Sequence, residues 1–215
     1  MKNKKYVWVS LLVLVFSSHL MAENVNNNAI LFDAMSPYED LTEYALEQDK
    51  GAIESALSSL NDLISELQNI LPPKRLQLLK DAAHKMTISN KNNDFAEIAL
   101  VAVDSYKFIS EQLDATELEI PKEVVILDYV GFKVHALLKQ QNISWDLIAI
   151  TVKEGVTQWE LIKTKVSDKA LYDAMNTAID GLKIASQTQN IPMLKFAAQV
   201  DLDLVDLLEG FFEKD

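Results

Sequence analysis

The chain has 215 residues, of which 20 are basic and 32 acidic, and it contains no cysteine. The lack of cysteine excludes c-type haem attachment, iron–sulfur clusters, cysteine-ligated zinc and thiol catalysis. A net charge of −12 argues against binding to nucleic acid or anionic lipid. A hydrophobic content of 49% is enough for the core of one medium-sized domain.

The first 22 residues follow the three-part pattern of a cleavable signal peptide. Lys2, Lys4 and Lys5 give a positive start, residues 6–16 are mostly apolar, and Ala22 offers a small residue for cleavage. The apolar run of 11 residues is well short of the ~20 that span a bilayer, which argues against an uncleaved anchor. Cleavage after Ala22 removes three lysines and no acids, so the net charge changes from −12 to −15. We therefore expect an exported, periplasmic protein that is not an integral membrane protein after cleavage.

The segment after the leader, residues 23–35, carries four asparagines and no clear period, and we expect a flexible lead-in there. Ser36-Pro37 has the form of an N-cap followed by proline in the first helical turn. The helix that starts there is expected to bend near Lys50-Gly51 and to continue to about Leu67, because apolar residues recur at spacings of three and four.

Two more helices are expected in the first half of the chain. Pro72-Pro73 ends the first helix and opens the second, and a third runs from about Asp94 to Leu113. Residues 121–140 are different, because apolar side chains cover most of their circumference. A helix of that kind is a buried one, so we expect it to be the central element.

Three helices are expected after the central one. The first opens at Asn142 or Ser144, the second at Ser167-Asp168, and the last runs from Pro192 to near Phe212. The order of caps, helices and asparagine-containing turns in residues 36–113 recurs in residues 144–212, and aligning Ala99 with Ala198 also brings Asp104 onto Asp203. Coincidence among amphipathic helices is the alternative to duplication.

The sequence shows no strand-like alternation and no hairpin dipeptide. We therefore predict an all-α fold, a helical bundle of about six to seven helices in a single domain over residues 36–215. Two repeated antiparallel helical units, 36–113 and 144–212, would flank the central apolar helix.

The central helix carries four residues that interrupt its apolar surface, namely Asp128, Tyr129, Gly131 and His135. A carboxylate buried there needs a partner or has a raised pKa. Asp128 and His135 share a face but lie about 10 Å apart along the axis, so a ligand, a metal or a neighbouring residue could bridge them. In the alternative interpretation they form an exposed stripe, and Gly131 only permits tight packing.

Asp201 is predicted to lie on the inward stripe of the last helix, which is an unusual place for a carboxylate. Trp159 is a candidate hydrogen-bond donor to such an acid, although tryptophan at helical spacing is more often a core residue. A small rotation of the helix would instead leave Asp201 at the solvent boundary.

No cofactor is predicted. Asp81-x-x-His84 is a single partial match to the Glu-x-x-His pairs of di-iron bundles, and the last helix has no histidine for haem. A metal or non-covalent haem held by the acids and histidine of the central helix is the alternative. Because no catalytic motif is present, a binding protein is favoured over an enzyme with carboxylate chemistry. We expect a non-catalytic module that binds a small molecule or an envelope protein through a groove between the two units.

Overall fold

The computed structural model describes residues 27–213, which form eight α-helices and no strand. The predicted all-α class is therefore confirmed. The predicted signal peptide, its cleavage site after Ala22 and residues 23–26 of the expected lead-in lie outside the described residues. Within the part of the chain that the structure describes, no helix is long and apolar enough to cross a membrane.

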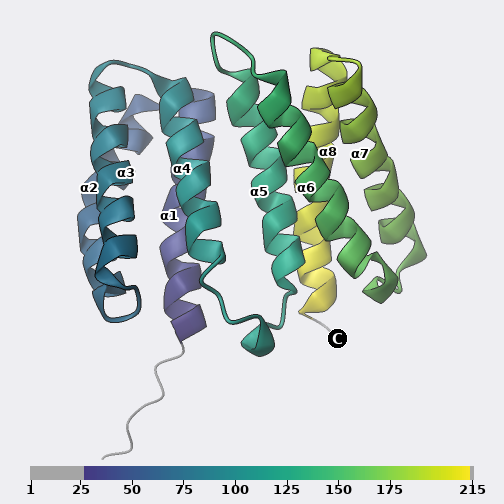
Figure 1. Ribbon diagram of the computed structural model, residues 1–215, viewed down its shortest axis with the longest axis horizontal. Coiled ribbons are helices and arrows are strands. Elements are labelled where there is room, and N and C mark those ends of the chain that lie inside the picture. The colour runs from purple at the N-terminus through teal and green to yellow at the C-terminus, as the bar shows by residue number, and fades with distance from the viewer. Residues whose placement is uncertain (1–26, 214–215) are drawn as a thin grey trace, which may run out of the picture.

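The first four helices form an up-and-down unit (Figure 1). They are α1 (Asn27–Glu47), α2 (Lys50–Glu66), α3 (Pro73–Lys91) and α4 (Phe95–Ser110). Each helix packs on the next, and α4 returns to make its most extensive contact with α1, which closes the unit. A short 3-10 turn, Leu67–Asn69, leads from α2 towards α3.

The last four helices form a second closed unit. They are α5 (Lys122–Leu138), α6 (Trp145–Ile162), α7 (Lys169–Gln187) and α8 (Ile191–Phe212), with 3-10 turns at Ala115–Glu117 before α5 and Lys163–Lys165 after α6. Helix α5 packs on both α6 and α8, and α7 completes the unit. The two units meet through α4 and α5, with a smaller contact between α1 and α5. The helix predicted to be a separate central element is therefore also the first helix of the second unit.

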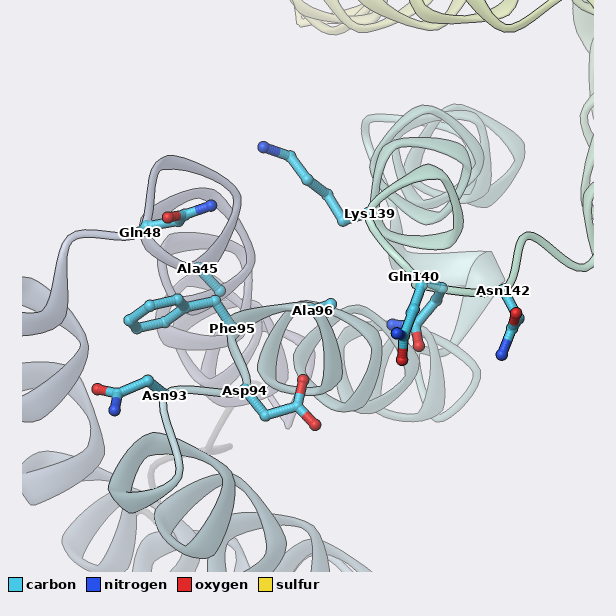
Figure 2. A pocket seen from close by; sticks show the side chains of 10 residues that line it. Ala45, Gln48, Asn93, Asp94, Phe95, Ala96, Lys139, Gln140 and Asn142 are labelled. Carbon is cyan, nitrogen blue, oxygen red and sulfur yellow. The ribbon is translucent and has the colours of Figure 1, made fainter.

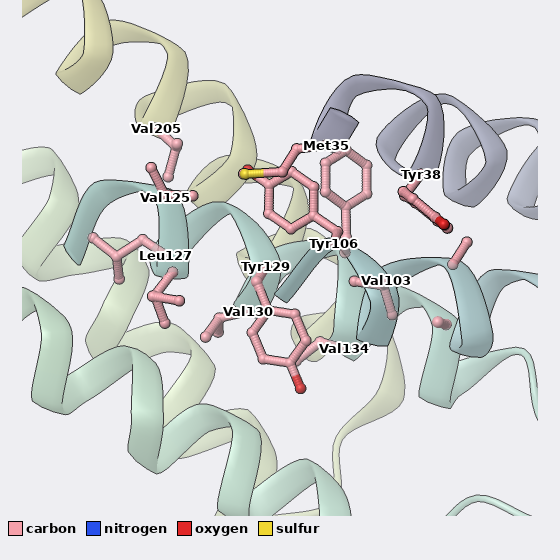
Figure 3. Close-up of a cluster of buried hydrophobic side chains, with 14 of the residues drawn as sticks. Met35, Tyr38, Val103, Tyr106, Val125, Leu127, Tyr129, Val130, Val134 and Val205 are labelled. Atoms are coloured by element: carbon pink, nitrogen blue, oxygen red, sulfur yellow. The ribbon is translucent and has the colours of Figure 1, made fainter. Parts of the chain in front are cut away.

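Helix α5 is buried at 14 of its 17 residues, as its apolar circumference predicted. Its valines and leucine meet side chains from α1, α4 and α8 in one continuous core (Figure 3). The cluster includes Met35, Tyr38, Val103, Tyr106, Val125, Leu127, Val130, Val134 and Val205. This core holds α5 in place, and with it the buried polar residues Asp128, Tyr129 and Lys133.

Helix α1 begins earlier than the sequence predicted. Residues 27–35, expected to be a flexible lead-in, are helical, and Pro37 lies inside α1 instead of at its first turn. Pro37 has no N–H to donate to the carbonyl of Asp33, but burial of the inner face of α1 offsets that loss. Asn28 anchors this end, because its side chain donates to the Asp114 carbonyl (2.9 Å) and accepts from the Asp114 N–H (2.8 Å).

The expected bend near Lys50-Gly51 is a complete break, so the first predicted helix is two helices and the total is eight. Gln48 adopts a left-handed φ of 62°, and Asp49 caps α2 by accepting from the Ala52 N–H. The same turn occurs at Asn93-Asp94 and Gln189-Asn190, where φ is 55° and 52°. In all three turns the N–H of the capping residue bonds to the carbonyl five residues earlier, at 2.9 Å. Glycine usually fills the left-handed position, and an amide residue fills it here.

Candidate functional site

Helix α5 presents polar side chains to two sides of the junction between the units. Tyr129 and Lys133, four residues apart, face the side formed with α4 and α6. Asp128, His135 and Lys139 line a groove on the other side, formed with α1 and α8. The two sides differ in how their charges are paired.

The side formed with α4 and α6 has matched charges. Lys133 Nζ lies 2.6 Å from an oxygen of Asp104, and Lys107 Nζ lies 2.5 Å from an oxygen of Glu154. Lys107 Nζ also lies 4.6 Å from the centroid of the Tyr129 ring, which is a cation–π distance. Each of these two lysines is therefore held by a carboxylate across a helix–helix contact.

The groove on the other side has a volume of about 510 Å³. Its lining combines carboxylates with apolar side chains. Helix α1 contributes Glu39, Glu43, Leu46 and Glu47; α5 contributes Asp128, Phe132, His135 and Lys139; and α8 contributes Gln199, Leu202, Asp203 and Asp206. None of these carboxylates forms an ion pair within residues 27–213.

The carboxylates of the groove repel one another. Burial, followed by the charge of Glu43 and then that of Glu209, raises the pKa of Glu39 from 4.5 to about 7. Burial also raises the pKa values of Glu43 and Glu209, and in both cases the charge of Asp206 adds to the effect. Near neutral pH the groove is thus an acidic site that holds protons more tightly than free carboxylates do.

Asp128 lies at the floor of the groove and is only 8% exposed. Burial first, and then the charge of Glu39, raise its pKa well above the ordinary value. The Tyr106 hydroxyl donates a hydrogen bond to the Asp128 carboxylate, which lowers the pKa and partly opposes these effects. Asp128 is therefore held in position by α4 while it faces a cavity shared by α1 and α8.

His135 shares the groove with Asp128, as the seven-residue spacing indicated. Its Nε2 is buried and has no hydrogen-bond partner among the described residues. Burial first, and then the positive charges of Lys195 and Lys139, lower its pKa. The lowered pKa favours the neutral imidazole, which has one donor and one acceptor nitrogen.

Three of the other residues selected from the sequence lie outside the groove lining. Tyr129 faces the matched side. A Cβ on Gly131 would lie 2.6 Å from side-chain carbons of Leu202, so this glycine permits the close packing of α5 on α8. The Trp159 Nε1–H donates to Asn176 Oδ1 at 2.7 Å, and its side chain is fully buried.

Asp201 lies on the buried face of α8, as its spacing predicted, and it is 0% exposed. Neither of its carboxylate oxygens has a hydrogen-bond partner among the described residues. Burial raises its pKa from 3.8 to about 8, so the side chain is a neutral carboxylic acid at neutral pH. The alternative of a solvated Asp201 is therefore wrong.

The acids that α1 and α8 contribute to the groove were not among the predicted site residues. Glu39 and Glu43 are four residues apart and so lie on one face of α1. Asp203 and Asp206 are three residues apart on α8. That spacing was visible in the sequence, but only the tertiary fold shows that the two acidic faces meet.

A second cavity of about 630 Å³ adjoins the groove, and Lys139 lines both. It lies at the ends of α1 and α5 and the start of α4, and many of its side chains are amides. Figure 2 shows Gln48 and Lys139 projecting into the space between α1 and α5. The nearby amides are Asn93, Gln140, Gln141 and Asn142.

The described residues contain no group of three or more His, Asp or Glu side chains placed to hold a metal ion. The groove acids are spread along three helices instead of converging on one point. This distribution fits an extended ligand better than a single ion.

The fold and the groove together define an all-α protein of two four-helix units with an acidic cavity between them. No family model, curated protein or solved structure matches the chain.

Proposed function

We propose that this protein is an exported, non-catalytic binding protein that holds a small organic cation in the groove between its two units. The observation that carries the proposal is the groove lining, in which carboxylates from α1, α5 and α8 outnumber the single lysine, Lys139, and none of them forms an ion pair within residues 27–213. A ligand with positive charge would supply the missing partner.

The lining also favours an organic ligand. Leu46, Phe132 and Leu202 give the groove apolar surface beside the acids. An amine or guanidine on an aliphatic or aromatic chain would bury its apolar part there and place its charge near Glu39 and Glu43. The imidazole of His135 adds a further polar group to the same lining. No part of this arrangement requires bond making or breaking.

Ligand charge and groove protonation are linked. Because mutual repulsion helps to raise the pKa of Glu39 to about 7, a bound cation would lower that pKa again. Binding near neutral pH should then release protons, and affinity should fall as the pH drops below about 7. Export is supported separately by the basic, apolar and small-residue pattern of residues 1–22.

Calorimetric titration with spermidine and with tryptamine tests the proposal. We expect a Kd in the micromolar range for at least one of them, and proton release that is visible as a dependence of the heat on buffer. Replacing Glu39 and Glu43 together by glutamine should weaken binding at least about tenfold, which corresponds to ~1.4 kcal/mol.

The matched control replaces Glu54 and Glu66 by glutamine, because these exposed acids of α2 carry the same charge away from the groove. Equal loss of binding in both double variants would show only a general attraction to an acidic protein and would refute the site. Binding of neither amine by the intact protein would refute the proposed ligand class.

A further inference from the structure

The outer face of α8 carries a stripe of apolar residues that the fold covers only in part, with Phe196 and Leu207 exposed. Phe196, Val200, Leu204, Leu207 and Phe211 follow one another at spacings of four, four, three and four, so they form one stripe along the helix. Phe196 is 71% exposed and Leu207 is 60% exposed. The opposite face of α8 is already buried in the second unit.

A helix that is apolar on both faces is normally covered on both. Of the eight large hydrophobic residues that the described part of the chain exposes, Phe196 is the most exposed. Leaving such side chains in water forgoes the free energy that their burial would contribute. Apolar residues on both faces of α8 are therefore typical of a helix that another polypeptide covers on its outer side.

The stripe borders a groove between α7 and α8 with a volume of about 620 Å³. Leu171 and Ala174 of α7 form one wall, and Leu204, Leu207 and Phe211 form the other. Two carboxylates, Asp168 and Asp206, lie at its rim. The groove therefore has an apolar floor and a negatively charged edge.

Gly210 gives an independent indication of what approaches this groove, because it lines the groove near the end of α8. A Cβ built there would meet no atom within 4 Å, so packing inside the protein does not require glycine. Glycine in a helix is less favourable than alanine. A residue without a side chain at this point allows another backbone to come close.

We infer that the α7–α8 groove docks a basic amphipathic helix of a partner protein. The apolar stripe would bury the apolar face of that helix, and its lysines or arginines would lie against Asp168 and Asp206. Charge argues against a second copy as the occupant, since two molecules of net charge −12 would bring their acids together. This surface is separate from the cation groove, although Asp206 lies at the edge of both.

The test uses a fluorescent peptide of leucine and lysine, about 14 residues long and ordered so that the leucines line one helical face. A scrambled peptide of the same composition is the reference. Anisotropy should show binding of the ordered peptide at least about tenfold tighter than that of the scrambled one. Leu207→Glu should remove this preference, although its added negative charge would attract lysine.

Ile150→Glu is the matched control, because Ile150 is 63% exposed on α6 and the substitution adds the same charge elsewhere. Gly210→Leu, which fills the groove, should weaken binding as Leu207→Glu does. Equal binding of the two peptides, or equal effects of the variants at 207 and 150, would overturn the inference. So would a wild-type dimer that Leu207→Glu converts to a monomer, because the occupant would then be a second copy.

Discussion

The two sides of α5 use charged residues in opposite ways. On the side of α4 and α6, Lys107 and Lys133 each meet a carboxylate across a helix contact. On the side of α1 and α8, acids from three helices face one another, and their repulsion and burial raise the pKa values of Glu39 and Asp128. The matched pairs link α4 to α5 and α6 across the junction of the units. The unmatched side lowers the stability of the free protein, so its acids indicate a role other than folding.

The largest effect of an unmatched carboxylate is expected at Asp201. Because its pKa rises from 3.8 unfolded to about 8 folded, stability should fall as the pH rises through this range and then stay constant. Asp201→Asn keeps the shape but cannot ionise. It should stabilise the protein by on the order of 5 kcal/mol near pH 7.5 and by almost nothing near pH 2, below both pKa values. Urea unfolding of both proteins across this pH range measures the difference, and parallel pH profiles would contradict it.

A matched pair should respond to charge removal in the opposite direction. Lys107→Met leaves Glu154 without its partner, and both side chains are about three-quarters buried. We expect a loss of about 1–2 kcal/mol in the free energy of unfolding. Lys169→Met is the control, since the Lys169–Asp173 pair is exposed and its loss should change stability by less than about 0.5 kcal/mol. An equal loss of stability in both variants would show that the buried Lys107–Glu154 pair contributes no more than the exposed Lys169–Asp173 pair.

Charge removal inside the groove should stabilise the free protein. The pKa of Glu39 is about 7 in the folded protein and 4.5 in the unfolded chain. Ionisation of Glu39 therefore lowers the free energy of unfolding as the pH rises from 4.5 to about 7, and it has no effect on stability below pH 4.5. After allowance for partial exposure, Glu39→Gln should add about 1 kcal/mol near pH 8 and nothing near pH 4. Thermal unfolding at both pH values checks this. Destabilisation at pH 8 would mean that Glu39 has a stabilising partner.

The smallest expected effect is that of salt. Raising NaCl from about 0.05 M to about 0.5 M screens the repulsion among the groove acids and should stabilise the wild type by about 0.5 kcal/mol near pH 8. The gain should shrink in the Glu39→Gln/Glu43→Gln variant and remain in Glu54→Gln/Glu66→Gln. A gain of the same size in both double variants would place the repulsion outside the groove.

Much of the fold could be predicted from helix signals. Ser144 and Asp168 cap α6 and α7 as expected, and the apolar circumference of residues 121–140 indicated the buried helix. The start of α1 could not be predicted in this way, because tertiary contacts decide it. Asn28 binds a loop 86 residues away, and burial of the inner face tolerates Pro37 inside the helix.

Of the groove residues, only those on α5 could be predicted from the sequence. Asp128 and His135 stood out because polar residues interrupt an apolar surface, and both line the groove. Their partners on α1 and α8 could not be identified, since acids are common on exposed helix faces and only the packing of the units brings Glu39 opposite Asp206. Gly131 also interrupts that surface but permits close packing on Leu202, and Trp159, a candidate donor to Asp201, donates to Asn176 instead.

The position of α5 also determines how the protein should unfold. Most four-helix units can melt separately, but α5 is a wall of the second unit and also packs on α1 and α4 of the first. Loosening the second unit would therefore expose apolar surface of the first at the same time. Both halves should be lost in a single cooperative transition, so that circular dichroism and the fluorescence of Trp145 and Trp159 on α6 follow the same curve.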